Sequence, residues 1–275
     1  MPEGHTIHRL AGELQECFGG TTVSVTSPQG RFAEGAALVD GSQMASAQAH
    51  GKHLFLEFVR GSPPESCHRR WVHVHLGLYG KLAIHAHAAG PPVGAVRMRL
   101  QTPTAHADLR GPTSCRVLDE AEKAAVHDRL GADPVRGDDP TAALARIHRS
   151  RSPIGVLLMD QSVIAGVGNV YRAEVLFRAG IDPARPGCEI HPDVLQDIWA
   201  DLTVLMKAGV ETGRIDTVRA EHEPDAMGRP PRVDDHGGEV YVYRRRGQPC
   251  HACGTDVRRR EAAGRNVFWC PRCQG

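Results

Sequence analysis

Four of the eight cysteines stand in two Cys-x-x-Cys pairs near the end of the sequence, and this pattern constrains the fold more than any other feature. The pairs are Cys250 with Cys253 and Cys270 with Cys273, and sixteen residues separate them. Such pairs bring four thiolates around one zinc ion, and four protein ligands leave no open position for a catalytic water. The pattern predicts one structural zinc ion in a short hairpin, with free or redox-active cysteines as the alternative.

The segment around these cysteines is strongly basic, although the whole chain has a formal net charge of only +1. From Val240 onward it holds eight arginines against two acidic residues. Arginine forks suit phosphate oxygens, and zinc would make so short a hairpin rigid, because it cannot form a core alone. The pattern favours a nucleic-acid-binding finger, and a solvated surface or a plain scaffold is the alternative.

The composition is that of an ordinary globular protein, with 41% hydrophobic and 24% charged residues among 275. No stretch approaches the roughly 18 to 20 apolar residues of a membrane span, and the first ten residues lack the basic and apolar regions of a signal peptide. We therefore expect a cytoplasmic protein that does not contact a membrane.

The hydrophobic pattern changes twice along the chain. Apolar residues recur at steps of three and four over residues 3–18, which predicts a helix. Residues 54–58 and 72–76 alternate in period two, which predicts an antiparallel sandwich or barrel extending to about Leu118. Beyond it we expect mainly helices, the first running from Asp119 and stopping at Gly131.

The second half of the chain contains the remaining expected elements. Residues 213–238 are rich in glycine, proline and charge and predict a long mobile loop. The predicted domains are 1–130, 131–238 and 239–275. The further predicted helices cover residues 140–148, 154–159, 169–178 and 192–212.

A glycine-rich turn, Gly166-Val-Gly168-Asn169, stands directly before one of these helices. Glycines at a helix start let backbone amides approach a phosphate, and the helix dipole favours its negative charge. Asn169 has the side chain to cap the helix and to bind the same phosphate. A simple tight turn is the alternative.

The start of the sequence, Met1-Pro2-Glu3-Gly4, offers a nucleophile. Removal of Met1 would leave Pro2 as a secondary amine, and an α-amino group titrates near pH 7.7 to 8.0, so its neutral form is accessible. This amine can form an iminium with an aldehyde carbon, and Glu3 is placed to transfer protons. An ordinary helix start, with Glu3 in the first turn, is the alternative.

Two further positions in the first half of the sequence stand out. Lys52, one of only four lysines, precedes an apolar strand, where an exposed strand-edge lysine is the alternative. Leu78 and Tyr79 stand at a glycine-flanked turn, His75 to Gly80. They are either ordinary core residues or wedges of the kind that proteins insert into a base stack.

Taken together, these motifs resemble the formamidopyrimidine-DNA glycosylase and endonuclease VIII family from end to end. The segments MPEG, LLMDQSVIAGVGNVYRAEVLFRAGIDP and YRRRGQPC with the two cysteine pairs follow in the family's order. The resemblance implies an α+β multidomain fold: an N-terminal antiparallel β-sandwich with an N-terminal helix, a helix-two-turns-helix domain and a C-terminal zinc-ribbon finger.

The resemblance also implies a bifunctional enzyme of base excision repair, a DNA glycosylase and AP lyase without catalytic metal or organic cofactor. Pro2 would attack C1′ of the damaged nucleotide while Glu3 handles protons. Lys52 and Arg265 would bind phosphate and assist β- and δ-elimination. Asn169 would bind phosphate, and Leu78 and Tyr79 would fill the space left by the flipped base. Damaged DNA is the implied partner of a monomer found at the nucleoid.

The sequence departs from the family pattern at three places. Thr6 stands where the family usually has a glutamate, Gly77 precedes Leu78, and the segment from Asp108 differs from the purine-specific loop. The MPEG start and the Leu78-Tyr79 pair favour the endonuclease VIII branch and oxidised pyrimidines. A DNA-lesion or abasic-site binding protein without base excision, an AP lyase only, and a zinc-ribbon adaptor are the competing hypotheses.

Overall fold

The computed structural model describes residues 2–60, 68–234 and 238–275, and the chain divides into two compact units. The first unit contains Pro2 and residues 6–129, and the second contains residues 3–5 and 130–275. The first helix therefore starts in the second unit and continues in the first. The predicted removal of Met1 concerns a residue outside the described ones.

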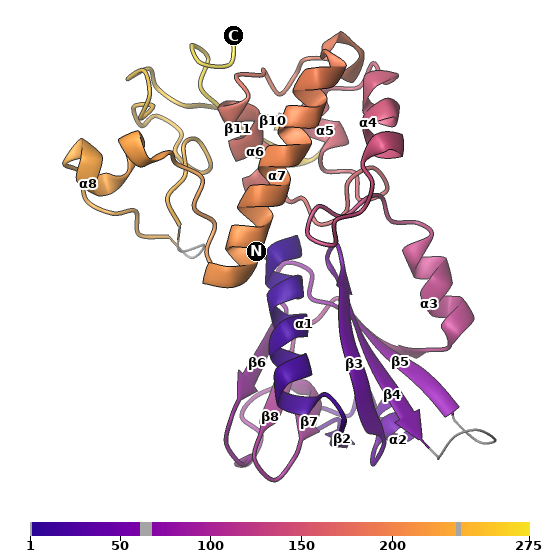
Figure 1. Cartoon of the computed structure of the whole chain (residues 1–275). Helices are drawn as coiled ribbons and strands as arrows, with labels where there is room; N and C mark the ends of the chain where they lie inside the picture. The colour runs from indigo at the N-terminus through magenta and orange to yellow at the C-terminus, as the bar shows by residue number, and fades with distance from the viewer. Residues whose placement is uncertain (1, 61–67, 235–237) are drawn as a thin grey trace. The chain divides into compact units, whose positions relative to one another are not determined.

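The first unit holds two antiparallel sheets, and Figure 1 shows their long strands β3, β4 and β5 side by side. The five-stranded sheet has the order β1-β3-β4-β5-β9 and the four-stranded sheet the order β2-β7-β8-β6. The helices are α1 (Gly4–Phe18), α2 (Ala33–Val39) and α3 (Glu120–His127). The strands are β1 (Thr21–Thr22), β2 (Ser24–Thr26), β3 (Gln43–His50), β4 (His53–Arg60), β5 (His68–His75), β6 (Lys81–His85), β7 (Val96–Gln101), β8 (His106–Arg110) and β9 (Ser114–Leu118).

The core of the first unit confirms the predicted sandwich, because it draws residues from both sheets and from α1. Leu54, Leu56 and Phe58 alternate on β4 and join this core, as a period-two pattern requires. Phe55 points to the other face of β4, where it packs with Trp71 and with residues of β9 and α3 in a smaller cluster. β4 is therefore buried on both faces, which explains its nearly continuous apolar sequence.

The helices of the second unit agree closely with the sequence prediction. Helix α6 (Asn169–Arg178) and helix α7 (Pro192–Thr212) have the predicted bounds, since Pro192 suits a first helical position and Gly213 ends α7 with a φ of 72°. The remaining elements are α4 (Thr141–His148), α5 (Ile154–Leu157), η1 (Gly187–Glu189), η2 (Ala220–His222), α8 (Pro224–Met227), β10 (Arg258–Ala262) and β11 (Arg265–Trp269).

The prediction of a long mobile loop over residues 213–238 is wrong for part of that range, because the structure places η2 and α8 within it. Pro224 occupies the first turn of α8 and Gly228 ends it with a φ of 61°. Pro224 and Gly228 therefore bound a short helix within a segment whose composition predicted a loop.

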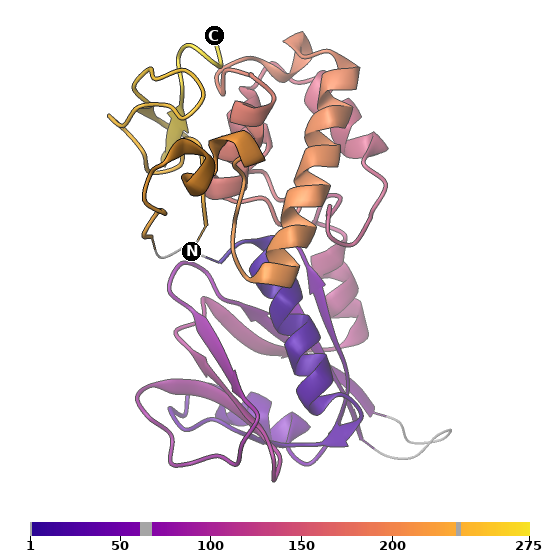
Figure 2. The same cartoon turned by 60° about the vertical axis from the view of Figure 1, so that its left-hand side comes forward.

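The finger does not have a core of its own, and its hairpin β10–β11 lies beside the helices of the second unit (Figure 2). Val257, Phe268 and Cys270 are buried in the same apolar cluster as Tyr171 and Leu202 from the helices. Gln274 strengthens the connection, because its side chain accepts the Cys270 N–H and donates to the carbonyl of Ile181, each at 2.9 Å. The finger is thus anchored on the helical part of its unit.

Candidate active site and zinc centre

The Glu3 side chain is buried at the N-terminus of α6. Its carboxylate accepts backbone N–H groups of Gly168 at 2.9 Å, Val170 at 2.8 Å and Tyr171 at 3.4 Å. The first N–H groups of a helix have no partners within the helix, and a carboxylate satisfies them while complementing the helix dipole. Glu3, the residue directly after Pro2, is therefore held in one orientation.

This arrangement corrects the predicted role of the glycine-rich turn. Backbone amides of this turn were expected to approach a phosphate, but those of Gly168, Val170 and Tyr171 bind Glu3. The glycine is needed for close approach, since a Cβ at position 168 would lie 2.2 Å from the carboxyl carbon of Glu3. The predicted cap by Asn169 is also wrong, because Gly168 is the N-cap residue of α6 and the Glu3 side chain accepts the N–H groups of the first turn.

Asn169 instead binds a buried arginine one helical turn later. The Arg172 guanidinium donates to the Asn169 side-chain oxygen, to the Gly155 carbonyl at 2.9 Å and to the Asn266 carbonyl at 3.0 Å. Burial lowers the Arg172 pKa to about 10, and the positive charge of Arg265 contributes to this shift. The second unit therefore gathers Glu3, Asn169 and Arg265 around the start of α6.

The first unit contains the other predicted contact residues. Lys52 lies in the turn between β3 and β4. Burial of His75 lowers the pKa of this histidine, and the positive charge of Lys52 lowers it further. Leu78 is 55% exposed and Tyr79 is 86% exposed in the turn after β5, so the alternative that they are core residues is wrong. Pro2 is half-buried.

Arg172 and His75 contribute to these positions, although no sequence motif singles them out. Arg172 stands three residues after Asn169, a spacing that places both on one helix face, so a signal was present. His75 faces His53, the neighbour of Lys52, across β5 and β4. That pairing depends on the strand register, which the sequence pattern alone did not determine.

The four cysteines form a site suited to zinc. The sulfur atoms of Cys250 and Cys273 are 3.9 Å apart, those of Cys253 and Cys270 are 3.4 Å apart, and all four lie within 4.8 Å of one another. Four thiolates around a tetrahedral zinc ion, with bonds of about 2.3 Å, would have sulfur atoms about 3.8 Å apart. Neighbouring His251 is not part of this group.

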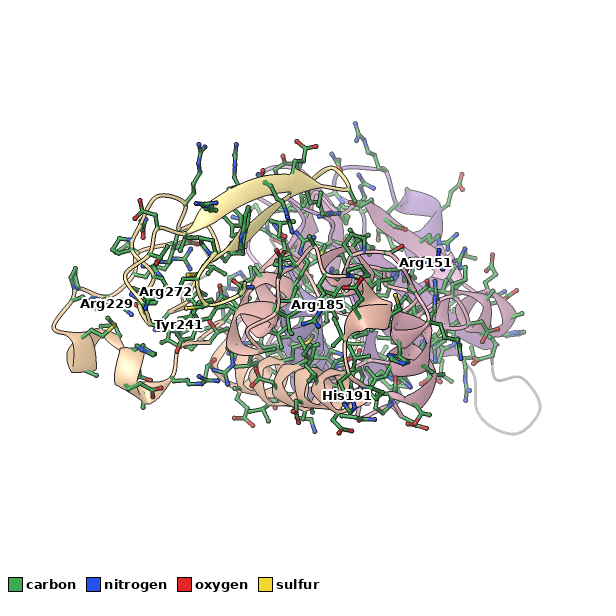
Figure 3. The ribbon with its side chains drawn as sticks, turned by 90° about the horizontal axis from the view of Figure 1, so that it is seen from above. Arg151, Arg185, His191, Arg229, Tyr241 and Arg272 are labelled. Carbon is green, nitrogen blue, oxygen red and sulfur yellow. The ribbon has the colours of Figure 1, made fainter. Side chains whose placement is uncertain are left out.

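The arginines of the finger region do not all face solvent. Arg245 is buried, and its guanidinium donates to the carbonyls of Tyr241 and Pro249. Arg260 pairs with Asp182 at 2.8 Å and stacks on Trp269. Both arginines therefore have structural partners, whereas Arg272 is exposed (Figure 3). The basic surface is smaller than the count of arginines suggests.

Comparison with known proteins accounts for most of the chain. Family models match over residues 1–115 (Formamidopyrimidine-DNA glycosylase N-terminal domain), 130–220 (Formamidopyrimidine-DNA glycosylase H2TH domain) and 247–275 (Zinc finger found in FPG and IleRS). Endonuclease 8 1 of Mycobacterium tuberculosis (strain ATCC 25618 / H37Rv) is 50% identical over 279 residues, covering 100% of both chains. The chain belongs to the formamidopyrimidine-DNA glycosylase and endonuclease VIII family.

Other relatives agree with this family membership. The formamidopyrimidine-DNA glycosylase of Thermosynechococcus vestitus is 30% identical over 240 residues, covering 82% of this chain and 78% of that protein. The Lactococcus lactis Fpg in complex with an oxidised pyrimidine containing DNA has the same fold, with a TM-score of 0.77 at 19% identity and 99% coverage of both chains.

Family membership confirms the resemblance found in the sequence and the α+β multidomain fold with a zinc finger. It also gives the enzyme class, a DNA glycosylase with AP lyase activity. The finger match and the cluster of four cysteines indicate a structural zinc site. Within the described part of the chain, no helix combines the length and apolar character that a membrane crossing requires.

Proposed function

We propose that this family member excises oxidised bases from damaged DNA, with pyrimidines favoured, and cuts the strand by β,δ-elimination through a Schiff base on Pro2. The observation that carries the proposal is the Glu3 carboxylate, which three backbone N–H groups at the start of α6 hold in one orientation; Glu3 follows the proposed nucleophile Pro2 in the sequence. A proton-transferring group next to a nucleophile needs such a fixed orientation.

The proposed chemistry needs an amine, a proton-transferring group and phosphate-binding cations. Once Met1 is removed, the Pro2 nitrogen attacks C1′, the glycosidic bond breaks, and the base leaves with the proton of the amine. The C1′–O4′ bond then opens, O4′ takes a proton from Glu3, and the nitrogen lone pair forms the iminium. The resulting iminium acidifies C2′, whose deprotonation expels the 3′ phosphate, and a second elimination expels the 5′ phosphate. Lys52 and Arg265 stabilise the departing phosphates, and water then releases Pro2.

Asn169, Leu78 and Tyr79 complete the proposed DNA contacts. Asn169 binds a backbone phosphate, which positions the duplex without reading sequence. Leu78 and Tyr79, both exposed, fill the gap that the flipped nucleotide leaves in the stack. Exposing an apolar leucine and a tyrosine ring to water is unfavourable for the folded protein. Their exposure suits a surface that contacts bases.

We also propose domain boundaries, a metal content and an oligomeric state for the protein. We assign a β-sandwich domain to residues 1–130, a helix-two-turns-helix domain to 131–238 and a finger to 239–275, the last two sharing the second compact unit. One structural zinc ion held by the four cysteines is the only metal proposed. The protein would act as a cytoplasmic monomer on damaged DNA.

Base release tests the proposal on duplexes that contain an oxidised pyrimidine, an oxidised purine or a plain abasic site. Release of the oxidised pyrimidine, faster than of the purine and accompanied by strand cutting with phosphate at both ends, is expected. Cutting of the abasic duplex alone would identify an AP lyase that has lost base excision, for which the departure at Thr6 gives a reason. Tight binding without cutting would support the lesion-binding alternative.

A further inference from the structure

Arg172 is a buried cation for which the described residues provide no carboxylate ion pair. It is 1% exposed, and its three hydrogen-bond acceptors are the Gly155 and Asn266 carbonyls and the side chain of Asn169. Its Nε is buried without a hydrogen-bond partner among the described residues. Burying a charge in this way is costly, so the arginine must do something that an apolar residue would not.

The hydrogen bond to Asn169 fixes which end of the asparagine amide faces outward. A guanidinium has only donors, so the Asn169 atom that it contacts must be the carbonyl oxygen. The N–H2 group then occupies the other branch of the planar amide. Within the described part of the chain this nitrogen has no hydrogen-bond partner, and it is not among the buried unpartnered atoms. Asn169 therefore presents two N–H donors to the surroundings.

The charges around Asn169 favour an anion at these donors. Arg265, which begins β11 and is exposed, lies close enough to Arg172 for the two positive charges to interact. The negative charge of Glu3 also acts on Arg172, but its carboxylate already binds three backbone N–H groups. Two neighbouring cations beside two outward N–H donors form a site for a phosphate oxygen.

We propose that Arg172 is a positioning residue that holds the Asn169 amide with its N–H2 group toward a DNA phosphate. This inference rests on the proposed phosphate contact of Asn169. Without Arg172 the amide would rotate freely and would present its oxygen to the phosphate for part of the time, which is repulsive. Through the Asn266 carbonyl, Arg172 also ties the finger hairpin, and with it Arg265, to the same place.

A double-mutant cycle on zinc-loaded, Met1-free protein tests the inference, with binding to a duplex containing a tetrahydrofuran abasic analogue as the measurement. The variants are Asn169→Ala, Arg172→Lys and the double variant. Lysine keeps the charge but cannot reach three acceptors with a planar fork. Each single change is expected to weaken binding about tenfold. The double variant is expected to bind as tightly as either single variant.

The dependence of binding on salt separates positioning from loss of charge. Arg172→Lys should leave the slope of log Kd against log salt unchanged, whereas Arg265→Ala should reduce it by about 0.9. If Asn169→Ala binds as tightly as the parent, the proposed phosphate contact itself is wrong. If Asn169→Ala weakens binding but Arg172→Lys does not, or if their effects multiply, the contact stands and the positioning role is wrong.

Asn169→Asp keeps the test independent of any folding defect caused by changing Arg172. The two side chains have the same shape, and a carboxylate accepts from Arg172 at least as well as the amide does. The variant should therefore match the parent in thermal stability and zinc content, yet bind DNA more weakly than Asn169→Ala, because it offers an oxygen to the phosphate. Binding equal to that of the parent would overturn the inference.

Discussion

At the scale of single residues, the site depends on a close approach between the Glu3 carboxylate and the backbone of α6. Gly168 makes the approach possible, and the Gly4 N–H donates to the Gly166 carbonyl at 2.8 Å beside it. The sequence showed glycines before a helix but did not show what they approach, because Glu3 and Gly168 are far apart in the chain. Only the tertiary structure reveals that the glycines serve a carboxylate.

The variant Gly168→Ala should therefore damage the site selectively. The new Cβ would overlap the Glu3 carboxyl group and displace it, with an expected loss of about 1 to 3 kcal/mol in the free energy of unfolding. Strand cutting should fall by at least about tenfold at saturating DNA. Single-turnover cutting and urea unfolding measure both effects.

Gly12→Ala is the matched control, since a Cβ at this position on α1 meets nothing within 4 Å. It should leave cutting unchanged and stabilise the protein slightly, because alanine favours a helix more than glycine does. Equal cutting by Gly168→Ala and the parent would show that the position of Glu3 does not matter for the reaction.

At the scale of elements, the sequence predicted helices better than it predicted contacts between strands. The bounds of α6 and α7 followed from local signals such as Pro192 and Gly213. The pairing of His53 with His75, and the stacking of His53 on His73, follow from the register of β4 and β5. Register depends on the whole sheet, so these pairs were not predictable from one segment.

The stacked histidines of β4 and β5 should make stability depend on pH. Burial, as the largest cause, lowers the pKa of His53 to about 3 and that of His73 to about 4, so both are neutral in the folded protein at pH 5. In the unfolded chain they bind protons below about pH 6.5. The unfolded state thus binds more protons between pH 6.5 and 4, and stability falls as the pH falls through this range.

Urea unfolding at several pH values measures this dependence. Each histidine contributes a slope of at most about 1.4 kcal/mol per pH unit, less for the half-buried His53. His73→Phe, which keeps an aromatic ring between His53 and Phe55, should flatten the curve. A slope that His73→Phe leaves intact would contradict the assignment.

The finger should lose its structure without zinc, while the first unit should not. Val257 and Phe268 are held in the helical core next to the cysteine site, so removing the metal with a chelator should expose their amides to hydrogen exchange. The amides of β4 should keep their protection. DNA binding should weaken as well, because Arg265 would no longer be held. Unchanged protection in protein shown to be free of zinc would contradict a structural zinc site.

At the scale of the whole molecule, the order of motifs along the chain predicted the fold and the family, both of which are confirmed. The Cys-x-x-Cys pairs, the turn before α6 and the Pro2-Glu3 start were each modest signals, and their combination was specific. The sequence did not predict that Arg245 is buried or that Arg172 holds Asn169, since burial of a charge depends on partners far away in the chain. The motifs predicted which residues have chemical roles. The contacts that hold those side chains in place were visible only in the structure.

Pro2 is the residue that we propose forms the covalent bond to DNA. Borohydride trapping of Met1-free protein on a duplex with one oxidised pyrimidine, followed by peptide mapping by mass spectrometry, tests it most directly. We predict that the reduced adduct is attached to the nitrogen of Pro2 and that Pro2→Gly greatly reduces strand cutting while DNA binding is preserved. An adduct on a lysine such as Lys52, or no adduct despite base release, would contradict the account.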